Sequence, residues 1–417
     1  MNENQLLRFT TAGSVDDGKS TLIGRLLYDS KSILQDQLSA VKQASKTKGI
    51  HAVDLALFTD GLKEERELGI TIDVAYRYFS TPKRKFIIAD APGHFQYTRN
   101  LVTAASTANA VVLIIDATKG VVEQTKRHLF IASLLQIQEL IVCVNKMDLV
   151  DYSEKIFEDI KTHFEQFSSK LAINNIQFIP MSALLGDNVV SSSSNMTWHK
   201  GPSLLDSLET LSINDNVDNK KGRFAVQTVL NPPFEKEKPY KGYAGRISSG
   251  IFKKGEKITV LPSGLTSTIR SINSYENELN EAFAPMSASM VLNDDLQINR
   301  GDMIVSSNEP PTLSQEFEAM LCWLNEKKAI SGARYLVRHT VNEQFGTIEK
   351  VISKYDIETF ELSNDDKAIE MNDIVRVQLK LNKPLIIDSF RDNQSTGSFI
   401  LIDSITNETV AAGMIVK

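Results

Sequence analysis

The segment that begins at Gly13 has the spacing of a phosphate-binding loop. It reads Gly13-Ser14-Val15-Asp16-Asp17-Gly18-Lys19-Ser20-Thr21, which matches G-x-x-x-x-G-K-[ST]. Glycines let such a loop curl so that several backbone N–H groups point at one anion, and the lysine adds positive charge near the β- and γ-phosphates. The serine hydroxyl is a ligand for Mg²⁺. The sequence therefore predicts a nucleotide phosphate site with a magnesium ion beside it.

A second segment with phosphate chemistry follows an apolar run at residues 86–89. It reads Asp90-Ala91-Pro92-Gly93-His94. An aspartate at the end of a buried strand can hold Mg²⁺, and the next glycine can offer its N–H to the γ-phosphate because it has no side chain. Asp, Pro and Gly also suit an ordinary turn. With the phosphate loop upstream, we expect Asp90 to serve the metal, and His94 to position the attacking water or act as its base.

A third segment has the residues that distinguish guanine from adenine. Asn145-Lys146-Met147-Asp148 follows an apolar run, and Ser182-Ala183-Leu184 follows another. A carboxylate can accept hydrogen bonds from N1–H and the 2-amino group of guanine, whereas adenine lacks both and would leave a buried carboxylate unpaired. We expect Asn145 to reach the N7 and O6 side and residues 182–184 to supply a backbone donor. GTP and GDP are the predicted ligands.

Thr71 is the candidate for a nucleotide-dependent switch. It can supply a hydroxyl to Mg²⁺ and its N–H to the γ-phosphate, a contact that exists with GTP and is lost on hydrolysis. The charged run at residues 63–67 is more typical of a solvated helix face, which does not account for Thr71. The predicted metal ligands are therefore Ser20, Thr71 and Asp90, and the predicted catalytic residues are Lys19, Thr71 and His94.

The elements that position these residues alternate between strand and helix up to residue 211. Apolar runs or alternating patterns predict strands at residues 6–11, 72–78, 85–89, 110–115, 140–144 and 177–180. Helical spacing is expected at 19–28 and near 95–108, 121–135, 153–171 and 202–211. This pattern predicts an α/β domain with a mostly parallel sheet and a hairpin beside it. Ligands bind at the carboxyl ends of such strands, where these segments lie.

The predicted secondary structure changes after a polar, turn-rich stretch at residues 213–222, which we interpret as a linker. Short strand-like segments with Gly, Pro and Asn between them then predict an all-β sandwich or barrel, and a break near residue 310 separates a second β module. The predicted domains are residues 1–215, 223–310 and 313–417.

Composition narrows the class of protein. Lys and Arg number 46 against 52 Asp and Glu, a net charge of −6 in 417 residues, which gives no general field for nucleic acid. No apolar run approaches the ~18 residues that span a bilayer, and the first residues lack a signal-peptide pattern. The two cysteines, Cys143 and Cys322, lie in apolar stretches, which fits a reducing cytoplasm. We expect a cytoplasmic protein without membrane or nucleic-acid partners.

Several of these segments together resemble the translation-factor class of P-loop GTPases. The resemblance rests on residues 13–20, 69–72, 90–94 and 145–148. Within that class, the chain is more similar to the large GTPase subunits of sulfate adenylyltransferase (ATP sulfurylase). That likeness rests on GSVDDGKSTLIGRLLYD at 13–29, GITIDVAYRYF at 69–79, QYTRN at 96–100, GDNV at 186–189 and the ending at 397–414. Ala91 and Phe95 depart from the pattern, which usually has Thr and Glu there.

The resemblance implies a fold, an activity and a partner. The fold is a GTPase domain followed by two β-barrels. The partner is a small catalytic subunit, in a heterodimer, that joins ATP and sulfate into adenosine 5′-phosphosulfate and pyrophosphate, the first step of sulfate assimilation. GTP hydrolysis on the large subunit drives that uphill nucleotidyltransferase reaction. Some relatives carry a fused adenylylsulfate kinase, which we do not expect here because no second phosphate loop is present.

Two other functions share parts of this evidence. A translation factor that delivers aminoacyl-tRNA or acts on the ribosome has the same GTPase segments, but a basic RNA-binding surface is expected of it. The net charge counts against it, and Asp16-Asp17 and residues 74–79 favour the sulfate interpretation. A regulatory GTP-binding module with negligible hydrolysis would lack a catalytic group at position 94, where His94 is present.

Overall fold

The chain divides into two compact units. One comprises Met1–Ile213 with Ile357–Phe360, and the other Asn214–Asp356 with Glu361–Lys417. The computed structural model describes residues 6–31, 55, 71, 73–171, 173, 175–212, 221–230, 241–275, 277–307, 310–329, 332–356, 359–363 and 368–416. Most of the linker predicted at 213–222 lies outside these residues. The predicted domain boundaries remain predictions.

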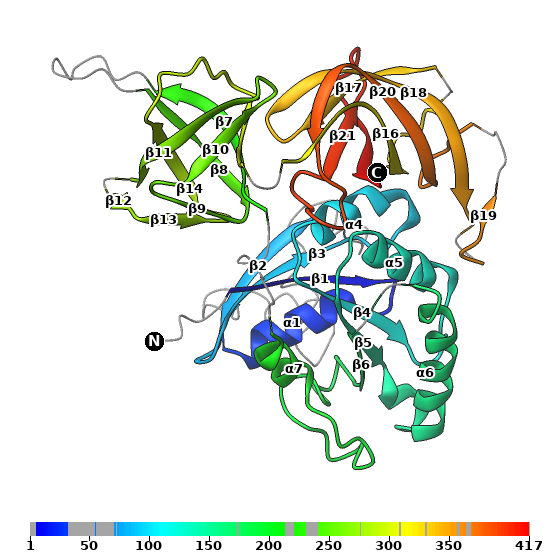
Figure 1. The fold of residues 1–417 in the computed structure, drawn as a ribbon. Coiled ribbons are helices and arrows are strands. Elements are labelled where there is room, and N and C mark those ends of the chain that lie inside the picture. The colour runs from blue at the N-terminus through cyan, green and yellow to red at the C-terminus, as the bar shows by residue number, and fades with distance from the viewer. Residues whose placement is uncertain are drawn as a thin grey trace. The chain divides into compact units, whose positions relative to one another are not determined.

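The first unit is built on a mixed sheet. Its described strands have the order β2-β3-β1-β4-β5-β6, with β2 antiparallel to β3 and the other neighbours parallel (Figure 1). The strands are β1 (Leu6–Gly13), β2 (Ala75–Ser80), β3 (Lys85–Asp90), β4 (Ala110–Asp116), β5 (Glu139–Asn145) and β6 (Asn175–Pro180). The predicted parallel sheet with an antiparallel hairpin at its edge is confirmed.

Helices cover this sheet as the apolar spacing predicts. They are α1 (Lys19–Asp29), α4 (Thr98–Ala105), α5 (Glu123–Leu134), α6 (Glu154–Ser168) and α7 (Leu204–Thr210), with short 3₁₀ turns η2 (Phe95–Tyr97) and η3 (Met147–Val150). Side-chain caps start two of them, because Ser153 accepts from Ile156 N–H before α6 and Ser203 from Asp206 N–H before α7. Helix α1 has no side-chain cap, and its N-cap residue is Gly18.

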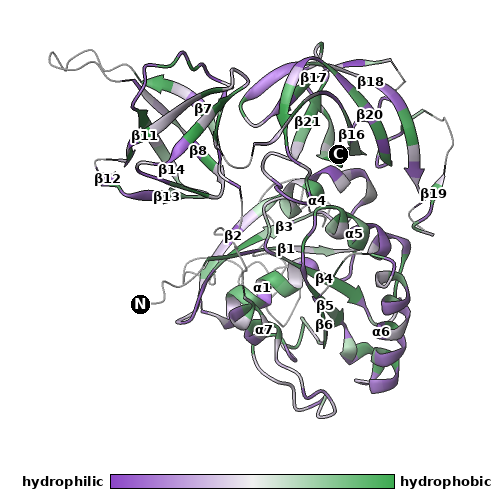
Figure 2. Ribbon diagram, viewed as in Figure 1, coloured by the Kyte–Doolittle hydropathy of each residue, from purple (hydrophilic) through white to green (hydrophobic). Residues whose placement is uncertain are grey.

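The central strands are buried on both faces, which explains their continuous apolar sequences. Every residue of β4 is buried, and Figure 2 shows β4 and β5 as largely hydrophobic. One core cluster joins Leu22 and Leu26 of α1 and Leu204 of α7 to alternate residues of the strands, such as Phe9 and Val112. The sheet is thereby held rigid, with its carboxyl ends free to carry a site.

The second unit contains two antiparallel barrels. The described strands of the first barrel run β10-β15-β7-β8-β14-β11-β12 and close through β10–β11, with β9 and β13 as a separate pair (Figure 1). They are β7 (Arg223–Leu230), β8 (Gly242–Ser249), β9 (Ile251–Lys253), β10 (Lys257–Leu261), β11 (Leu265–Ser274), β12 (Asn277–Leu279), β13 (Glu281–Phe283), β14 (Ser287–Leu292) and β15 (Met303–Ser306). Closure removes exposed sheet edges.

The second barrel has the same plan. Its described strands run β17-β21-β22-β16-β20-β18-β19 and close through β17–β18. They are β16 (Thr312–Trp323), β17 (Arg334–His339), β18 (Asn342–Tyr355), β19 (Leu362–Ser363), β20 (Ile374–Ile387), β21 (Ser398–Ile402) and β22 (Thr409–Ile415). Of the sandwich and barrel that the sequence pattern allowed, the structure has the barrel in both modules. The predicted fold class is confirmed.

A buried polar network joins these two barrels. Arg223 of β7 is fully buried, and its Nε and Nη2 donate to the two carboxylate oxygens of Asp388 at 2.9 and 3.0 Å. Thr396 also donates to Asp388, at 2.6 Å, and Asn393 donates to Ser249 at 2.8 Å. Burial opposes ionisation of Asp388, but the bonds from Arg223 and Thr396 outweigh it and lower its pKa.

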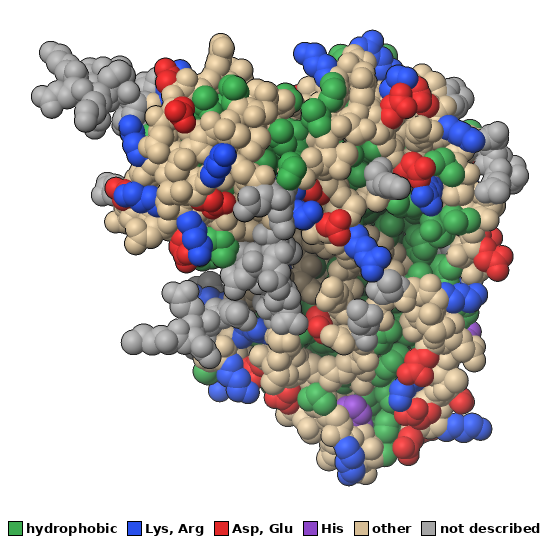
Figure 3. All heavy atoms as spheres, viewed as in Figure 1, with side chains coloured by type: hydrophobic (Ala, Val, Ile, Leu, Met, Phe, Trp, Pro, Cys, Tyr) green, Lys and Arg blue, Asp and Glu red, His purple; other side chains and the backbone are tan. Residues whose placement is uncertain are grey.

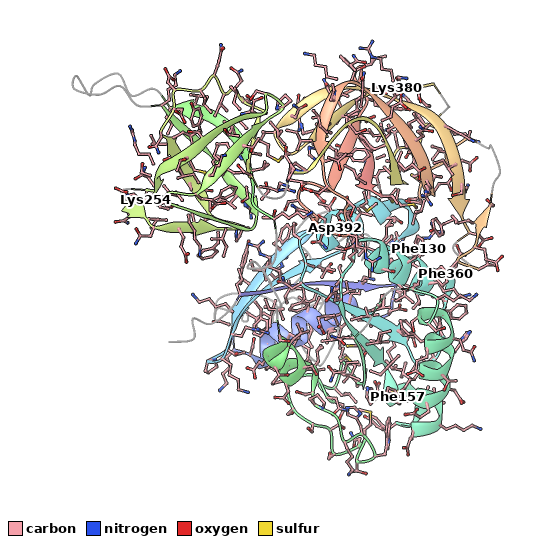
Figure 4. The ribbon with its side chains drawn as sticks, in the orientation of Figure 1. Phe130, Phe157, Lys254, Phe360, Lys380 and Asp392 are labelled. Carbon is pink, nitrogen blue, oxygen red and sulfur yellow. The ribbon has the colours of Figure 1, made fainter. Side chains whose placement is uncertain are left out.

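The surface carries both signs of charge. Figure 3 shows acidic and basic side chains interleaved on the face drawn, without a field of one sign. Lys380, labelled in Figure 4, is typical, because it pairs with Glu316 at 2.7 Å and with Glu349 at 3.3 Å. Within the described residues, no helix combines the length and the apolar character that crossing a bilayer requires.

Candidate nucleotide site

The predicted phosphate loop joins β1 to α1 at the carboxyl edge of the sheet. Gly18 has φ +96°, and a Cβ atom there would collide with the side-chain amide of Asn145. Both the left-handed backbone and the close approach therefore require glycine. Asn145 Nδ2 donates to Asp17 O at 2.7 Å, which ties this loop to the end of β5.

Lys19 is held against its own loop. Its Nζ donates to the carbonyls of Gly13 at 3.0 Å and Ser14 at 2.7 Å, and the residue is 7% exposed. Burial lowers the pKa of Lys19, and Asp90, Asp17 and Asp16 oppose that shift. The loop thus presents a desolvated cation, which strengthens its attraction for an incoming phosphate.

The loop also contains a carboxyl group whose role the sequence did not reveal. Asp17 is 2% exposed, and its Oδ2 accepts the N–H of Ser14 at 2.6 Å. Burial raises the pKa of Asp17, although the Ser14 bond and Lys19 act in the opposite direction. The side chain fixes the turn of the loop from inside. Aspartate at the fifth position of the motif, where most residue types are allowed, was the available signal.

The second phosphate segment lies directly against the loop. Asp90 ends β3, is 1% exposed, and its Oδ1 accepts the hydroxyl of Thr11, its register partner on β1, at 3.2 Å. A Cβ atom on Gly93 would collide with Lys19 Nζ and lie 2.7 Å from Gly13 O. Glycine is therefore required for the approach itself. Ala91 and Pro92 are buried between these two residues.

His94 follows Gly93 and is partly exposed. Its ring lies 6.2 Å from that of Tyr97, and its carbonyl accepts Tyr97 N–H at 3.0 Å. The structure places His94 next to the phosphate loop in the chain but gives its ring no bond to that loop. Thr71 is described, but its side chain makes no hydrogen bond to Ser20 or Asp90. The other switch residues, 64–70 and 72, lie outside the described residues.

The guanine segments are connected to each other and to the phosphate loop. Besides the bond to Asp17, Asn145 accepts Ala183 N–H on Oδ1 at 2.8 Å. Asn145 thus ties three loops together, and its Nδ2 group keeps a second N–H, so the expected contact with the N7 and O6 side stays a prediction. Met147 N–H also donates to Met181 O at 3.1 Å. Ser182 is fully buried.

Lys146 is fixed by a carboxylate that the sequence did not single out. Asp116 ends β4 opposite Asn145, and Lys146 Nζ donates to its Oδ2 at 2.7 Å. The other oxygen accepts the N–H and hydroxyl of Thr118. Burial opposes ionisation of Asp116, but these bonds outweigh it and lower its pKa.

Asp148 differs from its neighbours because it makes no hydrogen bond or ion pair with any described residue. It lies in η3 and is half-buried. Leu184 N–H likewise donates to no described group, whereas the other N–H groups of residues 182–186 all have partners. An open acceptor and an open donor remain, which is the complement of the N1–H and O6 edge of guanine.

The loop after residue 186 is ordered by its own polar side chains. Asn188 donates to Pro180 O at 2.8 Å and accepts Ser193 N–H at 2.7 Å, while Asp187 accepts the hydroxyls of Ser193 and Tyr152. Trp198 packs on Phe157 of α6, labelled in Figure 4, with ring centroids 5.3 Å apart. Sequence reasoning left this conformation open.

Family models match both ends of the chain. The model described as "Elongation factor Tu GTP binding domain" matches residues 4–219, and "GTP-eEF1A C-terminal domain-like" matches 316–416. "Sulfate adenylyltransferase subunit 1" of Bacteroides thetaiotaomicron is 47% identical over 424 residues, which cover 99% of this chain and 87% of that protein. The chain belongs to the sulfate adenylyltransferase subunit 1 family. The resemblance seen in the sequence is therefore confirmed.

Other relatives place the chain within this family. Sulfate adenylyltransferase subunit 1 of Saccharophagus degradans is 48% identical, with 99% of this chain and 87% of that protein covered. A "Bifunctional enzyme CysN/CysC" of Mycobacterium tuberculosis is also 48% identical, but this chain spans 67% of its length, and 64% of the Rhodopirellula baltica protein of that name. The S. cerevisiae Ski7 GTPase-like domain has TM-score 0.55 at 20% identity over 99% of this chain and 98% of that one, which shows the shared fold.

Proposed function

We propose that this chain is the GTPase subunit of a sulfate adenylyltransferase. Its hydrolysis of GTP drives the formation of adenosine 5′-phosphosulfate and pyrophosphate from ATP and sulfate on a separate catalytic subunit. Family membership supports this activity, and one structural observation supports guanine as the base. Among the described residues, Asp148 and the N–H of Leu184 have no hydrogen-bond partner, whereas the N–H groups of residues 182, 183, 185 and 186 are all bonded. A GTP-hydrolysing energy-coupling subunit accounts for both.

Each segment at the phosphate end of the site has its own role in binding or hydrolysing GTP. Residues 13–21 wrap the phosphates with backbone N–H groups, and Lys19 exchanges its bonds to Gly13 and Ser14 carbonyls for phosphate oxygens. Gly93 lies against the loop and offers its N–H to the γ-phosphate. His94 then orients the attacking water or accepts its proton. Asp148 reads the base, and Asn145, Lys146, Met147, Ser182 and Ala183 support it.

The residues present fit a magnesium ion. Mg²⁺ prefers oxygen ligands and typically uses one or two carboxylates together with substrate phosphates and waters. Ser20 supplies a hydroxyl and Asp90 a buried carboxylate, and we assign Thr71 as a further hydroxyl ligand. In the described part of the chain, no group of three or more His, Cys, Asp or Glu could hold a metal without a nucleotide. The ion would neutralise charge on the phosphates.

Coupling requires two states whose affinities differ at the partner surface. The contacts of Thr71 and Gly93 with the γ-phosphate exist with GTP and are lost with GDP, so they supply the bias. The partner is the small catalytic subunit, in a heterodimer. Cys143 and Cys322 are both buried and form no disulfide, which fits a reducing compartment, and we place the complex in the cytoplasm.

The experiment is GTP turnover by the purified chain, alone and with the small subunit from the same organism. ATP and sulfate are added in one arm and ribosomes in another. Faster turnover with the subunit and its substrates, together with adenosine 5′-phosphosulfate, is the expected result. Stimulation by ribosomes alone would leave the nucleotide site in place but move the function to translation.

A further inference from the structure

Helix α1 sends one side chain across to the guanine loop. Arg25 lies six residues after Lys19, and its Nε donates to Ala183 O at 3.2 Å. Its Nη2 donates to Leu184 O, and Nη1 pairs with Asp29 at 3.5 Å. The side chain is 18% exposed. One guanidinium group thus binds two successive carbonyls of the loop that carries the open donor.

These bonds determine where the N–H between the two carbonyls points. The peptide joining Ala183 to Leu184 is trans, so its C=O and N–H groups point in opposite directions. With the carbonyl of Ala183 turned toward Arg25, the N–H of Leu184 faces away from α1. It is also the N–H that has no described partner.

The rest of the loop is held from other sides. The N–H groups of residues 182, 183, 185 and 186 donate to Asp187 O, Asn145 Oδ1, Ser182 Oγ and Ser182 O, respectively. Asn145 joins the same loop to the phosphate loop. Arg25 is the side chain that fixes the remaining carbonyls of Ala183 and Leu184. Without it, these two peptides could rotate.

We propose that Arg25 is a positioning residue for guanine recognition. It holds residues 183–184 so that Leu184 N–H donates to O6 of the base, while Asp148 accepts from N1–H and the 2-amino group. Arg25 rests on the rigid helix that starts at the phosphate loop, so it also sets the distance between the phosphate and base contacts. The inference depends on the guanine site proposed above.

The test compares two nucleotides that differ at the atom in question. 6-Thio-GDP keeps N1–H and the 2-amino group but replaces O6 with sulfur, a weaker acceptor. The wild-type chain should bind GDP more tightly than 6-thio-GDP. Arg25→Ala should lower GDP affinity about 3- to 10-fold, the range for one hydrogen bond, and should remove most of the preference for oxygen over sulfur. Arg25→Lys keeps the charge without the planar fork and should stay near the alanine variant.

A matched control separates positioning from general support. Asp29→Asn removes the ion pair but leaves both carbonyl contacts of Arg25, so the GDP to 6-thio-GDP ratio should equal that of the wild type. The ratio of dissociation constants does not depend on how much of a variant is folded. Equal losses for both nucleotides in Arg25→Ala, or no loss, would overturn the inference.

A further arm distinguishes this inference from the site itself. Asp148→Asn should shift preference from guanine to xanthine nucleotides if the base site is correctly assigned. If that shift occurs and Arg25→Ala leaves the oxygen-to-sulfur ratio unchanged, the positioning role alone is wrong. If Asp148→Asn leaves guanine selectivity intact, the base site is wrong and Arg25 loses its proposed purpose.

Discussion

The two units differ in whether their polar groups have hydrogen-bond partners. In the second unit, Arg223 and Asp388 satisfy each other with two bonds, and Thr396 completes the set. In the first unit, half-buried Asp148 and the N–H of exposed Leu184 have no partner among the described residues. A closed network stabilises a joint between barrels, whereas an open one is built for a ligand that supplies the missing partners.

The buried cations of the two units, Arg223 and Lys19, also differ in their partners. Arg223 is fully buried and paired with a carboxylate, whereas Lys19, which is 7% exposed, is bonded to two neutral carbonyls. An ammonium whose hydrogen bonds go to neutral carbonyls is more poorly compensated than a guanidinium bonded to a carboxylate. We therefore expect changes at Arg223 and Asp388 to affect folding, and changes at Lys19 to affect nucleotide binding.

The largest effect is expected from Asp388→Ala. It leaves the fully buried guanidinium of Arg223 without its partner, so the free energy of unfolding of the second unit should fall by about 3–5 kcal/mol. Denaturant unfolding measures it. Asp392→Ala removes an exposed carboxylate four residues away (Figure 4) and is the matched control, with little change expected. Equal effects would contradict a closed network.

Lys19→Ala should impair nucleotide binding, the property that we assign to the first unit. Loss of a charge-assisted contact with phosphate should weaken both GTP and GDP by roughly 100-fold, since bonds to charged groups contribute about 1.5–3 kcal/mol. Without nucleotide, the substitution removes only the bonds from Lys19 to the carbonyls of Gly13 and Ser14. The unfolding midpoint of the nucleotide-free chain should therefore change little. Calorimetric titration reports the affinities. A large loss of stability with unchanged binding would reverse the assignment.

His128 of α5 predicts a pH dependence of the first unit. Its Nδ1 has no hydrogen-bond partner within the described residues, and burial, reinforced by Lys19 and Arg127, lowers its pKa to about 3. The unfolded chain, with a pKa of 6.5, takes up the proton first as the pH falls. Stability should therefore decrease by about 1.4 kcal/mol per pH unit below that value. His128→Gln should flatten this slope in unfolding measurements between pH 6.5 and 4.5, and an identical slope in both chains would exclude His128.

Asp116→Asn should produce the smallest effect. It removes the charge that fixes Lys146 but keeps a group of the same shape, so affinity should fall several-fold, consistent with about 1 kcal/mol for one bond. GDP and GTP should lose the same factor because the change lies at the base end. A loss confined to GTP would show that Asp116 acts at the γ-phosphate instead.

Much of the fold and of the site could be predicted from the sequence because local patterns specify both. The phosphate loop is contiguous, and continuous apolar runs mark the strands that place Asp90, Asn145 and Ser182 at one edge. The two barrels follow from short strands between turn residues. These signals depend on neighbours within a few positions.

What the sequence did not reveal depends on contacts between distant residues. Arg25 and Ala183 are 158 positions apart, and Arg223 and Asp388 are 165 apart. In the sequence, Arg25 is one polar residue on an amphipathic helix, and Asp116 is the polar end of an apolar strand. The bonds of Asn145 to Asp17 and Ala183 likewise join residues far apart in the sequence, so no local pattern shows them.

The most direct test of the account joins base recognition to energy coupling. In the complex of Asp148→Asn with the small catalytic subunit, ATP and sulfate are supplied with either GTP or xanthosine triphosphate. An amide at position 148 matches the 2-oxo group of xanthine, so adenosine 5′-phosphosulfate should form with xanthosine triphosphate and fall with GTP, the reverse of the wild-type complex. Synthesis that still follows GTP would contradict the claim that this site reads guanine and drives the reaction.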